Sequence, residues 1–140
     1  MVAALPLRAP DRKLRILIAD DHPLIRKVVR GVLEQDPRFE VCAEVVNGAA
    51  AIEEANRLKP DVVVLNVVMP VLNGLDAAKV IKSEVPASVI VILSTQADEV
   101  FVREAKKAGA HAYVSKSRAG DALITAIEAA LQGGGFVFVK

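Results

Sequence analysis

Residues 61–74 read DVVVLNVVMPVLNG, and this stretch gives the clearest indication of the fold. Its first part is an almost continuous apolar run that ends in a polar residue, Asn66. A strand this apolar is typical of a parallel sheet, in which helices cover both faces. The second part contains a Met-Pro and an Asn-Gly dipeptide, which favour a turn-rich loop. We therefore expect residues 61–66 to form the central strand of an α/β sheet.

Strand-like and helix-like segments alternate on both sides of this strand. The expected strands cover residues 14–19, 39–45, 61–66, 89–94 and 110–114, and the expected helices cover residues 23–35, 48–58, 75–84, 98–108 and 119–132. Strict alternation predicts five βα units with right-handed crossovers around one parallel sheet. The predicted fold is a doubly wound (βα)5 α/β domain.

The length of 140 residues argues for a single domain. We expect it to occupy residues 13–132, after a disordered N-terminal tail at residues 1–12 that lacks the features of a secretion signal. Residues 133–140 begin with three glycines and are interpreted as a C-terminal tail or a truncated linker.

The composition excludes several classes of function. Apolar residues make up 53% of the chain, but no run is long enough to span a bilayer, so no membrane partner is expected. The net charge of +1 gives no preference for nucleic acid, and none is expected as a direct partner. The single cysteine, Cys42, cannot form an internal disulfide, and we interpret it as a buried small hydrophobe in a cytoplasmic protein.

Polar side chains follow four of the five expected strands. Because the carboxyl ends of parallel strands meet at one edge of a sheet, these side chains should converge there, where such sheets bind ligands. The residues are Asp20 and Asp21 after the first strand, Asn66 at the third, Ser94 and Thr95 at the fourth, and Lys116 after the fifth.

This set resembles the receiver domains of two-component response regulators, in particular those that precede a helix-turn-helix output domain. Met69-Pro70, Asn73-Gly74 and Tyr113 belong to the same resemblance, which covers residues 14–132. It implies a flavodoxin-like sheet with strand order 2-1-3-4-5. It also implies a role in phosphorelay signal transduction.

The resemblance assigns a role to each residue of the set. In the family a carboxylate at the position of Asn66 attacks a phosphohistidine, and Mg²⁺ is held by that carboxylate, the acidic pair and a backbone carbonyl, here that of Val68. Lys116 would stabilise the transferred charge. Ser94 and Thr95 would line the phosphate pocket, and the rotamer of Tyr113 would follow the hydroxyl of Ser94 as a switch.

Asn66 departs from the family pattern at its chemical centre. An amide forms no acyl phosphate, so ordinary phosphotransfer should be absent and no catalytic residue is assigned. Mg²⁺ binding should be weak or absent, because one anionic ligand has become neutral. We expect Lys116, which loses a partner, to turn toward Asp20 or Asp21.

Each residue also has a simpler structural interpretation. Asp20 and Asp21 could cap the first helix. Lys116 could be a solvated lysine, Ser94 a satisfied hydroxyl and Tyr113 a packed aromatic. Asn66 could merely hydrogen-bond the neighbouring strand ends. His22 and His111 have no second histidine nearby to support a metal or catalytic role, and Gly48 and Gly74 are interpreted as turn and helix-start glycines.

Three functions remain open. The first is a non-enzymatic, phosphorylation-independent docking module for a histidine kinase, another regulator or a second copy. Its surface would be the helix at residues 98–108, the fifth strand and the last helix, with the charged residues Arg103, Lys106, Lys107, Asp121 and Glu128. The second is a phosphoacceptor, if Asn66 is an introduced or convertible residue. The third is a small flavodoxin-like ligand-binding domain.

Overall fold

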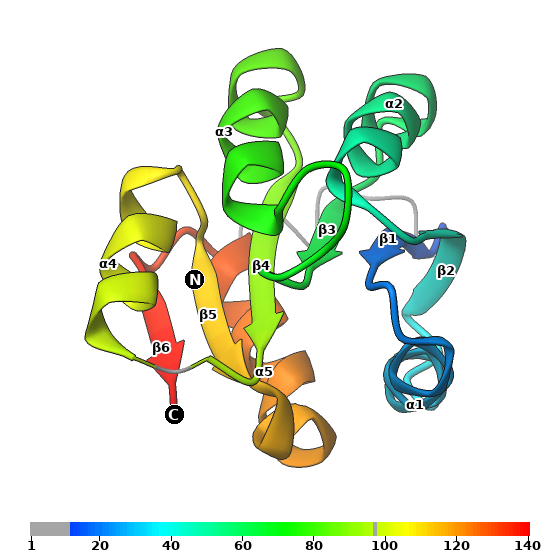
Figure 1. Cartoon of the computed structure of the whole chain (residues 1–140). Helices are drawn as coiled ribbons and strands as arrows, with labels where there is room; N and C mark the ends of the chain where they lie inside the picture. Colours follow the sequence, from blue (N-terminus) through cyan, green and yellow to red (C-terminus); the bar gives the residue numbers. More distant parts are fainter. Residues whose placement is uncertain (1–11, 97) are drawn as a thin grey trace.

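A computed structural model describes residues 12–96 and 98–140 (Figure 1). The predicted disordered tail, apart from Arg12, lies outside the described residues. The strands are β1 (Leu14–Ala19), β2 (Phe39–Val45), β3 (Val62–Leu65), β4 (Val89–Ser94), β5 (Ala112–Ser115) and β6 (Val137–Val139). The helices are α1 (Pro23–Glu34), α2 (Gly48–Leu58), α3 (Gly74–Glu84), α4 (Glu99–Lys107) and α5 (Ala119–Leu131), with a 3₁₀ turn, η2 (Lys116–Arg118), before α5.

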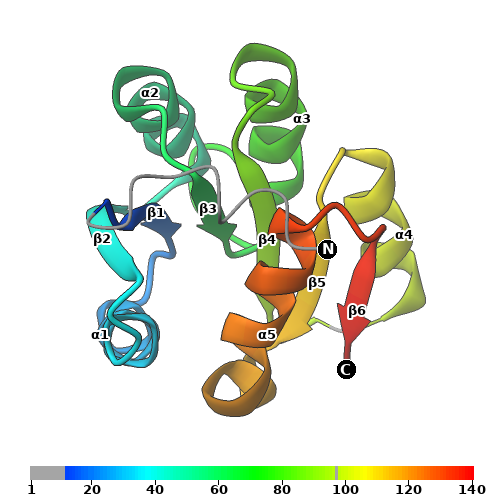
Figure 2. The ribbon, with the colours of Figure 1, turned by 180° about the vertical axis from the view of Figure 1, so that it is seen from behind.

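The strands form one parallel sheet in the order β2-β1-β3-β4-β5-β6. The predicted order of the first five strands is confirmed. The sixth strand was not expected, because the sequence places residues 133–140 outside the domain. It pairs with β5 and extends the sheet by one strand at that edge (Figures 1 and 2).

The central strand β3 shows why residues 61–66 are so apolar. Val62 and Val64 face the core beneath α1 and α5, while Val63 and Leu65 face the core beneath α2, α3 and α4. All four side chains are buried. Helices on both faces therefore require an apolar residue at every position of this strand, rather than at alternate positions.

Helix α1 buries fewer apolar side chains than its sequence offers. Val29 and Leu33 are buried against the sheet, whereas Leu24 is 70% and Val28 50% exposed. The helix therefore carries more apolar positions than one face of the sheet covers. In the described residues, no helix is both long and apolar enough to cross a membrane.

A β-bulge changes the environment of Cys42. The register of β1 against β2 shifts between Ile16 and Leu17, which leaves Cys42 as the extra residue. Its side chain is half-buried rather than fully buried, and the thiol donates to the carbonyl of Ile16 at 3.5 Å. Burial raises the pKa of this thiol, which disfavours the thiolate form on which cysteine reactivity depends.

Candidate functional site

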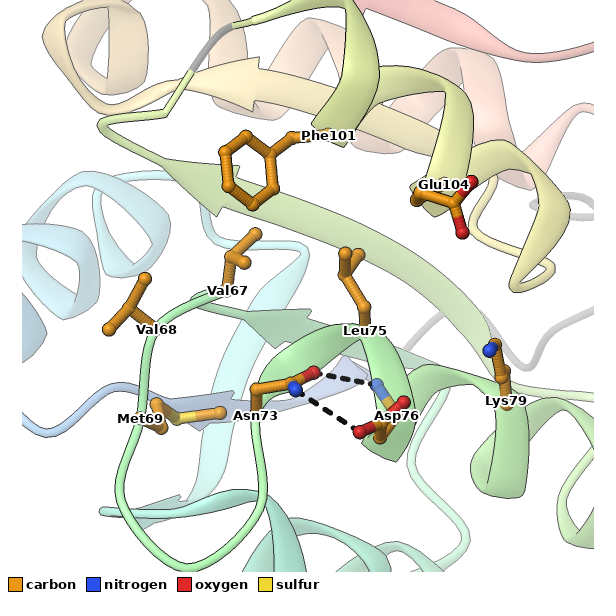
Figure 3. A pocket seen from close by; sticks show the side chains of 9 residues that line it. All are labelled: Val67, Val68, Met69, Asn73, Leu75, Asp76, Lys79, Phe101 and Glu104. Atoms are coloured by element: carbon orange, nitrogen blue, oxygen red, sulfur yellow. Dashed lines mark hydrogen bonds between the residues drawn. The ribbon is translucent and has the colours of Figure 1, made fainter.

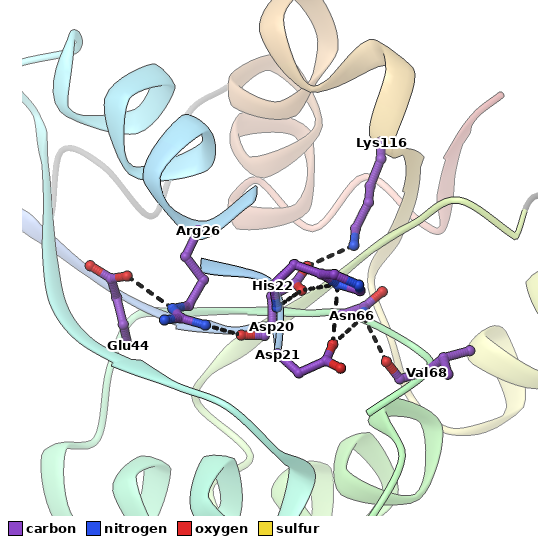
Figure 4. Close-up of polar contacts among 8 residues, drawn as sticks. All are labelled: Asp20, Asp21, His22, Arg26, Glu44, Asn66, Val68 and Lys116. Carbon is purple, nitrogen blue, oxygen red and sulfur yellow. Dashed lines mark hydrogen bonds and ion pairs between the residues drawn. The ribbon is translucent and has the colours of Figure 1, made fainter. Parts of the chain in front are cut away.

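Part of the predicted site converges at the carboxyl edge of the sheet, namely Asp20, Asp21, Asn66, Val68 and Lys116 (Figure 4). Parallel pairing places Ala19 opposite Leu65, so the residues that follow them, Asp20 and Asn66, emerge side by side. Pairing of Ser94 with Ser115 likewise places Lys116 beside the end of β4. The sheet register, set by its buried faces, therefore builds the site.

Lys116 is paired with the acidic residue nearest to it. Its Nζ lies 2.7 Å from Oδ2 of Asp20, and the two side chains are only 9% and 5% exposed. The expectation that Lys116 would turn toward the acidic pair is confirmed. Because both charges are removed from solvent, each depends on the other for compensation.

Asp20 is further held by His22. The carboxylate Oδ1 accepts from the backbone N–H of His22 at 2.9 Å and lies 3.1 Å from its Nδ1. Helix α1 begins after His22 without a side-chain cap. The helix-capping interpretation of Asp20 and Asp21 is therefore wrong, because the hydrogen bond of Asp20 goes to His22 and not to the first turn of the helix.

Asn66 hydrogen-bonds within the loop that follows β3 and toward the end of β1. Its side chain is buried, and its Nδ2 donates to the carbonyl of Val68 at 2.8 Å and toward Oδ1 of Asp21 at 3.5 Å. Both neighbours are acceptors, which assigns the amide orientation with nitrogen inward. The predicted hydrogen bonding of Asn66 to a neighbouring strand end is present at Asp21, and the shorter bond goes to the loop that follows β3.

The acidic residues and His22 form a cluster that could hold a cation. Ligand atoms of Asp20, Asp21 and His22 all lie within 4.8 Å of one another. Carboxylate oxygens suit Mg²⁺, but the Asn66 N–H groups point at two of the oxygens expected to bind it. The donor set fits a divalent cation only if the amide rotates and turns its oxygen inward.

Two glycines hold the loop between β3 and α3 against this site. A Cβ on Gly74 would lie 1.9 Å from the backbone oxygen of Asn66, and one on Gly48 would lie 2.3 Å from that of Leu72. Both glycines start helices, as expected, and neither has a positive φ. Glycine is therefore required at both positions because the backbone of the loop approaches too closely for a side chain, and not because of an unusual φ.

The outer side of this loop borders a groove that the sequence did not indicate (Figure 3). The groove has a volume of about 280 Å³ between the loop, α3 and α4. Val67, Leu75 and Phe101 form its apolar lining, and Lys79 and Glu104 stand at its end. These residues are separated in sequence and join only through the packing of α3 beside α4.

The backbone of Gln96 links the predicted switch residues. Ser94 is buried, and its Oγ accepts from the backbone N–H of Gln96 at 3.0 Å, whereas Thr95 is exposed. Tyr113 is fully buried, and its hydroxyl donates to the carbonyl of Gln96. Burial raises the pKa of this phenol. The two predicted switch side chains thus contact one short segment after β4.

The charged residues predicted as an interface already have partners within the chain. Such exposed pairs are weak, so they do not exclude a protein partner, but they make these charges less available. The contacts are Arg103 with Glu99 at 3.6 Å, Lys107 with Glu104 at 3.6 Å, Asp121 with Arg118 at 3.0 Å, Glu128 with Arg38 at 2.6 Å, and Lys106 with the Phe136 ring at 5.9 Å.

Arg26 supports the site and was not anticipated from the sequence. Its Nη1 donates to the backbone oxygen of Asp20 at 2.7 Å, and its Nε lies 3.3 Å from Glu44 on β2 (Figure 4). Arg26 therefore ties α1 to the ends of β1 and β2. An arginine on the first helix gives no signal of this role in the sequence, because the role depends on how α1 packs.

Comparison with known proteins agrees with this geometry. The response regulator receiver domain family matches residues 16–128. The chain is 35% identical over 130 residues to the transcriptional regulatory protein DegU of Brevibacillus brevis, covering 93% of this chain and 55% of DegU. The chain thus spans about half the length of such curated relatives.

Solved structures show the same fold. A LuxR-family two-component response regulator from Aurantimonas sp. SI85-9A1 superposes with a TM-score of 0.84 at 33% identity, covering 89% of each chain. The response regulator domain of Thermotoga maritima CheB superposes with a TM-score of 0.80 at 27% identity, covering 86% of this chain and 97% of that one. The chain therefore belongs to the receiver domain family of two-component response regulators.

Proposed function

We propose that this receiver domain acts as a phosphorylation-independent docking module for other proteins. The observation that carries the proposal is the hydrogen bond from the Asn66 amide to the Val68 carbonyl at 2.8 Å. A neutral amide occupies the position where the family resemblance expects a carboxylate. Its donors face the groups that would otherwise bind the cation.

The chemistry of the amide supports this proposal. A carboxylate oxygen carries the charge and lone pairs needed to attack a phosphoryl group, and its acyl phosphate is stabilised by a metal and a lysine. The Asn66 oxygen carries no full charge, and Lys116 is engaged with Asp20 at 2.7 Å. The lysine and the carboxylates that would stabilise a phosphoryl group and its metal ion are retained, but Lys116 and Asp20 form an ion pair with each other.

Mg²⁺ binding is proposed to be weak. Asp20 and Asp21 supply two carboxylates, and the Lys116 ammonium already offsets one of these charges. Affinity for such ions depends strongly on the number of anionic ligands. When bound, a divalent cation would neutralise charge at the ends of β1 and β3.

The proposed partners are proteins, namely a histidine kinase or another response regulator. The net charge of +1 gives no support for direct binding of nucleic acid by this domain. No catalytic activity of its own is proposed. Leu24 and Val28 on α1 are exposed apolar residues that an interface could cover.

A phosphoacceptor function is the second candidate, and the retained Asp20, Asp21 and Lys116 favour it. It requires Asn66 to be converted to aspartate. Membership of the receiver family favours both candidates over a general ligand-binding domain of flavodoxin-like fold.

The test is incubation with acetyl phosphate and Mg²⁺, read by intact mass. The parent chain should gain no phosphoryl group, whereas Asn66→Asp should gain one. The same variant incubated with a chelator in place of Mg²⁺ is the control and should gain none. An adduct on the parent chain would contradict the proposal, and no adduct on Asn66→Asp would show that more than the acceptor has been lost.

A further inference from the structure

The outer edge of β5 is occupied by residues 136–139 (Figures 1 and 2). Strand β6 pairs parallel with β5, with Phe138 opposite Tyr113, and the N–H of Val137 donates to the carbonyl of His111 at 3.1 Å. This edge belongs to the surface that the sequence predicts for docking. The chain therefore occupies, with its own strand, the backbone groups through which a partner strand could be added.

Side chains of the same segment cover Tyr113. The Phe138 ring meets the Tyr113 ring edge-on, with centroids 5.9 Å apart and an interplanar angle of 77°. Lys106 of α4 lies over the Phe136 ring at 5.9 Å. Tyr113 is fully buried, whereas Phe138 is 43% exposed. Phe138 thus separates the predicted switch residue from solvent.

The attachment of this segment is well suited to release. Strand β6 has three residues, and pairing this short is marginal without support from neighbouring elements. Gly133 and Gly135, which precede it, have φ values of 72° and 96°, and a Cβ at either would meet nothing within 4 Å. The N–H groups of Gly133 and Gly134 donate to the carbonyls of Ala130 and Ala129 and close the end of α5. Gly135 therefore remains as the hinge at which the segment can change conformation without disturbing α5.

We propose that the edge of β5 is a strand-binding surface and that residues 136–139 are its resident intramolecular occupant. While they are bound, the edge is closed and Tyr113 is covered. Release of the segment opens the edge to an extended apolar strand of a partner that presents an aromatic side chain to Tyr113. This inference extends the proposed docking function by naming its surface, and its test uses no phosphate donor, so the two proposals can fail separately.

Tyr113 reports directly on this closure, because the chain has one tyrosine and no tryptophan. Val137→Pro in the full chain removes the N–H that bonds to His111 and should release the segment. Tyrosine fluorescence should then become accessible to acrylamide, whereas it stays protected in the parent chain. Phe138→Ser, which leaves the backbone pairing possible, should also expose Tyr113. Lys140→Pro, beyond the strand, is the matched control and should stay protected.

A synthetic peptide of residues 133–140 tests the surface itself. It should bind Val137→Pro saturably and restore protection of Tyr113, while the parent chain should not bind it because its site is filled. A peptide carrying Val137→Pro should have no effect. The inference is overturned if Tyr113 stays protected in both folded variants, or if the peptide fails to restore protection. A parent-chain dimer that Val137→Pro abolishes would also overturn it, because the occupant would then be a second copy.

Discussion

The amide of Asn66 donates a 2.8 Å hydrogen bond to the carbonyl of Val68 and so occupies an oxygen that is predicted to bind the cation. In receiver domains that bind Mg²⁺, the resemblance expects this carbonyl to face the cation. Here an N–H group of Asn66 faces the carbonyl instead. The same amide nitrogen also lies 3.5 Å from Oδ1 of Asp21, a second oxygen expected to bind the cation. The amide therefore supplies partial positive charge where a cation would supply full charge.

Removing Lys116 should destabilise the fold. Lys116→Met removes the ammonium that pairs with the carboxylate of Asp20, whose side chain is 5% exposed, and leaves that carboxylate only its contacts with His22. We expect the free energy of unfolding to fall by about 3 kcal/mol. Urea denaturation measures it. Lys107→Met is the control, because its pair with Glu104 at 3.6 Å is solvent-exposed and should contribute less than about 1 kcal/mol. Equal effects of the two substitutions would contradict the account of a buried pair.

Gly74 should tolerate no side chain. In Gly74→Ala the new Cβ would lie 1.9 Å from the backbone oxygen of Asn66, so the loop or α3 must move. We expect a loss of about 2 kcal/mol or more. Gly120→Ala in α5, where a Cβ meets nothing within 4 Å, should instead gain about 0.5 to 1 kcal/mol. Thermal unfolding of both variants gives the comparison, and stabilisation by both would contradict the close approach.

The five predicted βα units were recovered from the alternation of apolar and polar residues, because that alternation reflects which faces are buried. Strand β6 was not recovered. Its Val-Phe-Val sequence, which follows three glycines and Phe136, is equally typical of a linker. The open edge of β5, the contact with Tyr113 and the packing of Val137 and Val139 against the core make it a strand. Tertiary packing, rather than local sequence, determines such a short strand.

Some features of the site could be predicted from the sequence, and others depend on tertiary packing. Convergence of Asp20, Asn66 and Lys116 followed from the positions of the strand ends, and the direction of Lys116 followed from its lost partner. The roles of Arg26 and His22 did not follow, because they depend on side-chain orientation at the start of α1. Three of the charged surface residues pair at a spacing of three or four residues, which the sequence already shows. The partners of Glu128 and Lys106, which are Arg38 and the Phe136 ring, are distant in sequence and follow only from packing.

Val71 carries backbone strain at the tip of the loop. Its φ is 69° and its side chain is 81% exposed, a combination that a β-branched residue rarely adopts. Val71→Asn should raise the free energy of unfolding by about 1 kcal/mol, because asparagine tolerates the left-handed region. Val68→Asn, at an exposed position without a positive φ, should change it by less than about 0.5 kcal/mol. Chemical denaturation of the two variants gives both free energies of unfolding. Equal gains would point to a general effect of a polar side chain at an exposed position, rather than to relief of strain at Val71.

His111 should make the fold sensitive to acid. Burial, followed by the charge of Lys82, lowers its pKa, and its Nδ1 accepts from the N–H of Ile90 at 3.0 Å. As the pH falls through about 6.5, the imidazole of His111 is protonated more readily in the unfolded chain than in the folded one. The contribution of His111 to the free energy of unfolding is therefore present at neutral pH and lost on acidification.

His111→Asn provides the test, because the asparagine oxygen can replace Nδ1 as the acceptor without titrating. Its stability should depend less on pH than that of the parent chain between neutral pH and the folded-state pKa of His111. Denaturation at a series of pH values measures this difference. Parallel pH profiles for the two chains would show that His111 does not contribute.

A Mg²⁺ titration by calorimetry of the parent chain, Asn66→Asp and Asn66→Ala shows whether the Asn66 amide blocks the cation site. If the amide closes the site, Asn66→Asp should bind Mg²⁺ at least about tenfold more tightly than the parent chain, since it adds a charge and removes the donors. Asn66→Ala, which only removes the donors, should lie between them. Equal affinity of the parent chain and Asn66→Asp would contradict the account.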